Sequence, residues 1–371
     1  MNIVIAVLLV FALIGLIDKI TGNHLRLGTE FDKGIDIMGS MALALVGISC
    51  IGVYAASANA EAIARLAGVL PFDPAVIVGC LLAPDMGGMT ISLEIAGSRE
   101  VGIFAGMVLS TTIGVTLCFQ LPVCIAGIKE KEDKALIMKG FIIGIITVIP
   151  GIILGAFLLG LSLTEMFFNT LPVLIVCAVL AAGYKLSATA TAKALTGVAN
   201  TVRIISLILF ALVILGIYVE KFAIADAGIV KDTFVCCGKM ASVVCGSMVF
   251  SKIALRYFKK PFNALAKVMG TNVQAVMGIL LGMTTTFAML PLFPEMDRRG
   301  KLINGAFSVG GAYIIGGQMA YVSGLTTGYE IFVFFTVKIV FTICACGAVC
   351  LIDRAKTGID SDTQTSPEIR G

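Results

Sequence analysis

Asp85 is a carboxylate inside an apolar stretch, and its neighbours interrupt the helix that this stretch would otherwise form. The stretch reads CLLAPDMGGMTISLEIAG over residues 80–97. Pro84 cannot continue the helix before it, and Gly87 and Gly88 permit backbone turns that other residues resist. A carboxylate at the centre of a bilayer costs about 2.5–3.5 kcal/mol on insertion scales. A carboxylate placed there on a broken helix is suited to binding a small polar cation.

A second apolar stretch, residues 272–295, is interrupted in a similar way by GMTTTFAMLP. Its centre offers three threonine hydroxyls. Corresponding broken segments in two halves of a chain are the best sequence pointer to the substrate site of a transporter. We therefore predict a substrate site made of Asp85, Met86, Gly87, Gly88, Thr284, Thr285, Thr286, Asn304 and Tyr313. In an alternative interpretation, Asp85 caps the second half-helix, because Asp is a good N-cap; it could also do both.

Three further carboxylates near the ends of these stretches are gate candidates, namely Glu94, Glu295 and Asp297. Glu94 could equally be solvated or paired with Arg99. Glu295 and Asp297 could belong to a salt-linked interfacial anchor with the basic residues that follow them. Asn304 and Tyr313 could serve interhelical packing or hydrogen bonding. Two lysines, Lys239 and Lys338, lie inside apolar segments; Lys239 could snorkel to the interface.

The composition of the chain indicates that these residues lie in a membrane protein. The chain has 371 residues, 58% hydrophobic and 13% charged, with a mean hydropathy of +1.02, whereas soluble domains carry about 25% charged residues. Apolar runs near the length of a membrane span recur throughout. The net charge of +4 reflects loop lysines and does not indicate nucleic-acid binding. The 11 cysteines lie mostly in apolar runs without a CxxC pair. We expect no metal, no cofactor and no enzymatic activity.

The sequence predicts an all-α polytopic membrane protein with nine transmembrane helices and two re-entrant hairpins, 74–97 and 272–295. The predicted spans are 2–17, 36–57, 101–128, 139–160, 167–184, 202–219, 232–255, 302–324 and 329–352. If both interrupted stretches are re-entrant, 20 Lys and Arg residues lie on one face and 4 on the other. The positive-inside rule then places the N-terminus outside and the C-terminus in the cytoplasm.

The two halves of the chain match each other at a shift of 199 residues. Segment 39–85 aligns on 238–284 without a gap and gives eleven identities in 47 positions, among them Gly79 and Gly278. An extra span between the halves would invert one relative to the other, as in many secondary transporters. The predicted organisation is a first repeat at 1–165, a linker span and loop at 166–200, an inverted second repeat at 201–352, and a polar cytoplasmic tail at 353–371.

Three motifs resemble the ethanolamine-utilisation transporter family of bacteria: FDKGIDIMGSMALALVGISCIG (31–52), GCLLAPDMGGMTISLEIAGS (79–98) and EMDRRGKLINGAF (295–307). The likeness spans nearly the whole chain. It implies a permease of the bacterial inner membrane that brings ethanolamine into the cytoplasm for catabolism. The chain departs from the family pattern at Thr285 and Thr286, where paired amides are expected, and at GGQMAY (316–321), which replaces a more polar run.

The implied substrate suits the residues, because ethanolamine is mostly protonated at neutral pH and an ammonium needs acceptors or an aromatic face. A carrier with alternating access is the leading hypothesis. The alternatives are a channel-like facilitator, an ethanolamine-binding sensor or scaffold without net transport, and a membrane enzyme acting on a lipid amine, for which no nucleophile or metal cluster is visible. Besides ethanolamine, expected partners are the lipid bilayer, a coupling proton or sodium ion, and further copies of the chain in a homo-oligomer.

Overall fold

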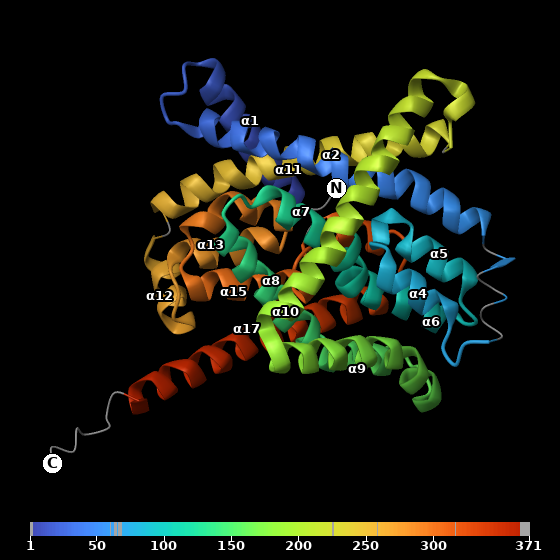
Figure 1. Cartoon of the computed structure of the whole chain (residues 1–371). Coiled ribbons are helices and arrows are strands. Elements are labelled where there is room, and N and C mark those ends of the chain that lie inside the picture. The colour runs from blue at the N-terminus through green and yellow to red at the C-terminus, as the bar shows by residue number, and fades with distance from the viewer. Residues whose placement is uncertain are drawn as a thin grey trace, which may run out of the picture.

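The computed structural model describes residues 3–59, 61, 62, 65, 69–224, 226–257, 259–315 and 317–363, and every regular element in these ranges is helical. Figure 1 shows the arrangement, with the long helices α2 and α11 crossing above shorter, broken helices. The all-helical class predicted from the sequence is therefore confirmed.

The first half of the chain contains α1 and α2, a pair of short helices joined by a turn, and a long helix made of four segments. The bounds are α1 (Ile3–Ile20), α2 (Leu27–Ala58), α4 (Pro74–Leu81), η1 (Pro84–Met86), α5 (Gly88–Ile95), α6 (Arg99–Ile103), η2 (Phe104–Gly114), η3 (Thr116–Gln120), α7 (Leu121–Gly127), α8 (Lys131–Thr147) and α9 (Ile149–Leu158). The helix from α6 to α7, called the central helix below, is almost wholly buried.

The second half begins in α10, a long helix with non-helical backbone at Ser187. The bounds are α10 (Leu163–Tyr218), η4 (Glu220–Phe222), α11 (Ala227–Tyr257), α12 (Lys259–Met269), α13 (Val273–Gly282), α14 (Thr286–Met289), η5 (Leu290–Glu295), α15 (Arg298–Gly310), α16 (Gly317–Ser323) and α17 (Gly328–Thr363).

The starts and ends of these helices correspond at the 199-residue shift found in the sequence. Residues 27–58 of α2 map onto 226–257, and α11 covers 227–257. The starts of α4 and α6, at Pro74 and Arg99, map onto the starts of α13 and α15, at Val273 and Arg298. The sequence repeat is thus accompanied by a repeat of helix boundaries.

The predicted count of nine spans is not confirmed in the described ranges. Five helices in the described ranges are long and apolar enough to cross a membrane, or six if α12 and α13, which meet at 95°, count as one. The predicted span 302–324 is broken, because α15 ends at Gly310 and α16 starts at Gly317. Between these helices, the backbone N–H groups of Tyr313 and Ile315 donate to the carbonyl oxygens of Gly282 and Met283. These two N–H groups therefore do not make the hydrogen bonds of a continuous helix.

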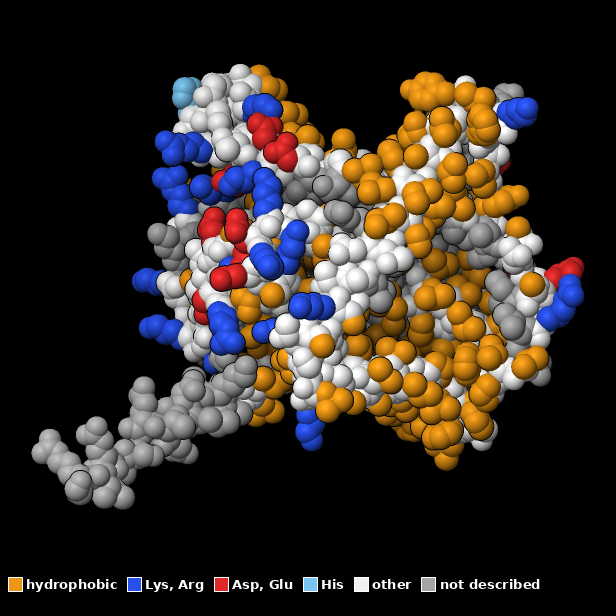
Figure 2. Space-filling model, in the orientation of Figure 1, with side chains coloured by type: hydrophobic (Ala, Val, Ile, Leu, Met, Phe, Trp, Pro, Cys, Tyr) orange, Lys and Arg blue, Asp and Glu red, His pale blue; other side chains and the backbone are white. Residues whose placement is uncertain are grey.

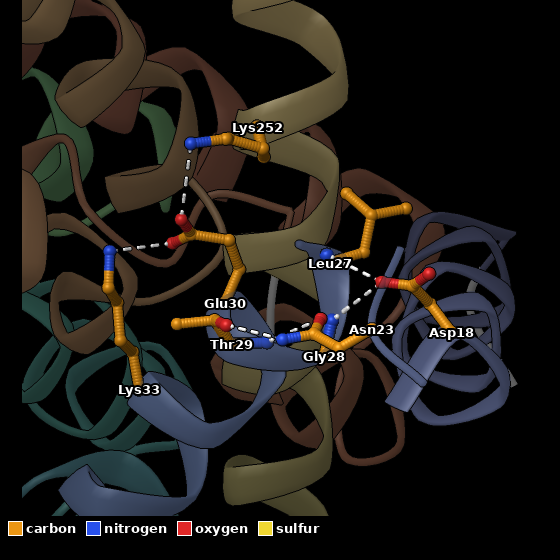
Figure 3. Close-up of polar contacts among 8 residues, drawn as sticks. All are labelled: Asp18, Asn23, Leu27, Gly28, Thr29, Glu30, Lys33 and Lys252. Carbon is orange, nitrogen blue, oxygen red and sulfur yellow. Dashed lines mark hydrogen bonds and ion pairs between the residues drawn. The ribbon is translucent and has the colours of Figure 1, made fainter. Parts of the chain in front are cut away.

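The turn from α1 to α2 is fixed by carboxylates (Figure 3). Asp18 accepts hydrogen bonds from the backbone N–H groups of Leu25, Leu27 and Gly28; Figure 3 draws the last two. Desolvation by itself would raise the pKa of Asp18, but these three donors outweigh it and hold the pKa below its ordinary value. Glu30 pairs with Lys33 and with Lys252, so that it links the start of α2 to α11.

Charged and apolar side chains occupy different parts of the surface (Figure 2). In this view charged groups gather on the side of α12, while apolar side chains dominate the opposite side and the lower face. Exposed apolar residues recur on α10 and α17, such as Ile175, Val179, Phe332 and Ile339. Large exposed apolar areas on a stable fold mark contact with lipid or another protein.

Candidate functional site

The stretch 74–97 forms a hairpin whose two ends meet. The Asp73 carboxylate accepts from Ala75 N at 2.8 Å, which caps α4, and from Gly97 N at 2.8 Å, where α5 has ended. The Ser92 hydroxyl also donates to Ala75 O at 3.4 Å. The chain thus runs along α4, turns at η1 and returns as α5, which lies beside α4.

The stretch 272–295 has the same form. The Asn272 side chain accepts from Ala275 N at 3.1 Å, which caps α13, and donates to Glu295 O at 2.8 Å at the end of η5. Asn272 therefore closes the second hairpin as Asp73 closes the first, and the two residues are 199 positions apart.

At the first tip the backbone turns sharply and presents Asp85. Gly87 has φ +92°, a left-handed conformation that glycine adopts without penalty. A Cβ on Gly88 would lie against Ser110 Oγ and the carbonyl oxygens of Leu82 and Ala83. The N-cap of α5 is Gly87, so Asp85 does not cap the second half-helix. The Asp85 side chain is half-buried, and among the described residues none forms an ion pair with it.

The second tip presents threonine hydroxyls in a buried setting. Thr284, Thr285 and Thr286 are all buried. Thr285 is the N-cap of α14 and accepts from Phe287 N at 3.4 Å. The turn after α15 lies along this tip, because Tyr313 N donates to Gly282 O at 3.1 Å. Tyr313 has φ +62°, an uncommon conformation for a bulky residue that the surrounding contacts must hold.

Both tips meet the central helix within one turn of each other. Met86 Sδ lies 3.9 Å from Cys118 Sγ, and Gln120 Nε2 donates to Thr286 Oγ1 at 3.3 Å. The Tyr313 hydroxyl lies beside the Thr285 and Thr286 hydroxyls and interacts electrostatically with Asp85. The predicted residues of the two tips are therefore gathered in one buried polar cluster.

A second tyrosine approaches Asp85 from α16. The Tyr321 hydroxyl lies beside the Thr90 side chain and interacts electrostatically with Asp85. Tyrosine offers both a hydroxyl and the face of an aromatic ring, and both are suited to a cation. The carboxylate of Asp85 is thus bordered by Tyr313 and Tyr321.

The remaining candidates lie away from this cluster. Asn304 donates to Ala275 O and Gly300 O, both at 2.9 Å, and holds α15 against α13. Asp297 caps α15 through Gly300 N and accepts from Thr271. Glu94 and Glu295 are exposed, and Arg99 pairs with Glu330 at 3.2 Å instead of with Glu94.

Sequence reasoning missed Gln120 and Tyr321. Gln120 is the only side-chain amide in 101–128, a signal that could have been used. The π-helical backbone of η2 and η3 lies at the same place. Thr111, Thr112 and Thr116 each donate to the carbonyl four residues before, at 2.6 Å; such bonds compete with helical ones. π-Helical turns often occur at functional sites.

Lys338 connects the central helix to the segment that carries Tyr313. Its ammonium is wholly buried and donates to Thr111 O at 2.7 Å and Ala312 O at 3.0 Å. It lies 5.7 Å from the Phe334 ring centroid. In the described part of the chain no carboxylate pairs with it, so backbone carbonyls and a ring provide its solvation.

A cavity of ≈ 530 Å³ opens beside the second hairpin. Val123 and Leu290 line it. Val123 lies three residues after Gln120, and Leu290 lies four residues after Thr286. Its other lining residues include Asp36, Glu130 and Asp133, and Asp133 pairs with Lys301. Within the described ranges, no group of three or more His, Cys, Asp or Glu side chains could hold a metal ion.

The long apolar helices are those of a multi-pass membrane protein. The chain belongs to the family described as "Ethanolamine utilisation protein, EutH", which matches residues 1–352. It is similar to the probable ethanolamine permease EutH of Listeria monocytogenes, at 31% identity over 87% of each chain.

Two other relatives extend the comparison. The probable ethanolamine permease EutH of Escherichia coli is 25% identical over 98% of this chain and 99% of its own. An uncharacterized protein of Bacillus subtilis, YxeR, is 29% identical over 87% of each chain. No solved structure matches the chain.

Proposed function

We propose that this protein carries ethanolamine, as the protonated amine, across the bacterial inner membrane into the cytoplasm. The observation that carries the proposal is Asp85, a half-buried carboxylate at a hairpin tip that interacts electrostatically with Tyr313 and Tyr321 and has no ion-pair partner in the described ranges. Carboxylates at membrane depth are costly unless a cation or hydrogen bonds compensate them. An ammonium substrate would supply that cation.

In the orientation proposed below, the cavity beside the second hairpin lies on the cytoplasmic side, where it provides a route for a cation leaving the site. Carboxylates in a concave surface raise the local concentration of positive ions; Asp36 and Glu130 line this cavity together with Lys129, while Asp133 is paired with Lys301. Inward movement of one positive charge gains about 2.3 kcal/mol per 100 mV of inside-negative potential. The potential alone could therefore drive accumulation, and a coupling proton or sodium ion is not required.

We further propose that the two halves, 1–165 and 201–352, are inverted repeats that move relative to each other in alternating access. The matching helix boundaries and the matching hairpin closures by Asp73 and Asn272 support this arrangement. With residues 166–200 as linker, the N-terminus lies outside and the tail 353–371 is cytoplasmic. Thiol labelling of Ser98→Cys from outside and of Lys129→Cys from inside tests the orientation; the reverse pattern would contradict it.

The decisive experiment is uptake of labelled ethanolamine into proteoliposomes, with membrane potential and pH gradient imposed separately. Asp85→Asn retains the shape but removes the charge, and loss of a charge partner commonly costs 2–5 kcal/mol. We expect a more than tenfold loss of apparent affinity, since about 1.4 kcal/mol is one decade. Glu94→Gln, in the same hairpin but exposed, is the matched control. Normal uptake by well-expressed Asp85→Asn would refute the counter-ion role.

The same vesicles separate the alternatives. A carrier shows faster uptake when the vesicles are preloaded with unlabelled ethanolamine, whereas a channel-like facilitator does not. A sensor or scaffold would bind ethanolamine in detergent but give no uptake under either gradient.

A further inference from the structure

Gln120 lies beside the second tip, where it contacts Thr286. Its side chain is buried, with 1% exposed. Gln120 Nε2 donates to Thr286 Oγ1 at 3.3 Å, and Gln120 Oε1 lies 3.2 Å from Thr116 Oγ1, whose single proton is shared with Thr112 O at 2.6 Å. A primary amide has two N–H donors, and only one is used by these contacts. The amide is thus oriented by two neighbours and keeps a donor.

Tyr313 adds a second uncommitted polar group beside the second tip. Its hydroxyl is buried beside Thr285 and Thr286, yet no group in the described part of the chain completes a well-aligned hydrogen bond with it. An unsatisfied buried polar group costs about 1–3 kcal/mol. Ser110 Oγ and Gln318 Oε1, on the central helix and on α16, are buried without partners in the same described ranges. Buried groups in this condition call for a ligand or water.

Apolar side chains close the cluster beside the second tip. The rings of Phe119 and Phe287 pack edge to face with centroids 5.0 Å apart, and both side chains are buried. Phe119 directly precedes Gln120, and Phe287 directly follows Thr286. A hydrogen bond in such a dry setting is stronger than one in water.

We propose that Gln120, Thr286 and Tyr313 form a subsite for the hydroxyl end of an amino alcohol. The proposal rests on the proposed function, in which Asp85 holds the ammonium end. The site would then distinguish an amino alcohol from an alkylamine of the same length. Thr116 acts as a positioning residue, because it touches Gln120 and not the substrate. A site built to hydrogen-bond a substrate hydroxyl rejects an analogue without it, since its own polar groups are then left unpaired.

The test compares binding of ethanolamine and ethylamine by isothermal titration of the purified full-length protein. Both ligands carry the ammonium, so the ratio of their Kd values reports the hydroxyl alone. We expect the unmodified protein to prefer ethanolamine at least tenfold. Gln120→Met, similar in size but apolar, should reduce that preference at least fivefold, by weakening ethanolamine and leaving ethylamine unchanged. Thr116→Val should reduce it less, and Gln274→Met, a half-buried glutamine at the far end of α13, should not change it.

The outcomes separate this proposal from the proposed function. The subsite would be overturned if the unmodified protein bound both amines without preference, or bound neither. It would also be overturned if Gln120→Met weakened the binding of both amines equally. If Gln120→Met does not fold, Thr116→Val and Tyr313→Phe still report the ratio. A tenfold preference in binding that is lost in these variants, without uptake into vesicles, would support the subsite and refute transport.

Discussion

Asp73 and Asn272 make equivalent contacts although 199 residues separate them. Each side chain accepts a hydrogen bond from the first turn of its own helix, at Ala75 N or Ala275 N. Each then bonds the backbone at the far end of its hairpin, at Gly97 N or Glu295 O. A single side chain thus begins one leg of a hairpin and ties down the other leg.

Asp73→Ala should open the first hairpin at its base. The substitution removes an N-cap, which contributes about 1 kcal/mol, and a second hydrogen bond of about 1 kcal/mol. We expect the free energy of unfolding to fall by about 2 kcal/mol. Asp73→Asn keeps an acceptor oxygen and should lose less than half of that. Unfolding can be followed with a thiol-reactive dye, because the chain has 11 cysteines and many are buried. Equal midpoints for all three proteins would contradict the closure role.

The hairpins could be predicted from sequence because their signals are local. Pro84 and the glycines after it interrupt one apolar stretch, and three threonines interrupt the other. The break at Tyr313 could not be predicted, because residues 302–324 contain no proline and no charged residue. Its cause is a pair of backbone hydrogen bonds to Gly282 and Met283. Gln120 could have been singled out as the only side-chain amide in 101–128, but its contact with Thr286, 166 residues away, could not be predicted.

Gly114→Ala should displace the first hairpin from the central helix. A Cβ at this position would collide with the carbonyl oxygens of Leu82 and Gly79. Backbone atoms cannot rotate away, so we expect a loss of about 1–3 kcal/mol from overpacking and reduced uptake in vesicles. Gly347→Ala is the matched control, since nothing lies within 4 Å of its added Cβ. Alanine there should stabilise α17 by about 0.5–1 kcal/mol. A stable, active Gly114→Ala protein would show that the hairpin can shift freely.

The turn at Asp18 should weaken in acid. The folded-state pKa of Asp18 lies below its ordinary value, so the carboxylate stabilises the fold above the ordinary pKa of an Asp, and this contribution disappears as the pH falls through the lowered pKa. Asp18→Asn should reduce stability at pH 7. The difference between the two proteins should shrink toward pH 3, as measured by unfolding midpoints in detergent across that range. A difference independent of pH would mean that the charge of Asp18 is irrelevant.

Lys338 should act mainly through its hydrogen bonds to Thr111 O and Ala312 O. Lys338→Gln and Lys338→Met both remove the charge and are similar in volume, but only glutamine keeps N–H donors. Each carbonyl left unpaired in a buried site costs about 1–3 kcal/mol. We therefore expect Lys338→Met to be less stable than Lys338→Gln by about 2 kcal/mol, measured as the difference in unfolding free energy. If Lys338→Met is the more stable of the two, removing a polar group from the buried site stabilises the protein by more than the lost hydrogen bonds cost. The hydrogen bonds would then not explain the lysine, and its charge would be the reason for its presence.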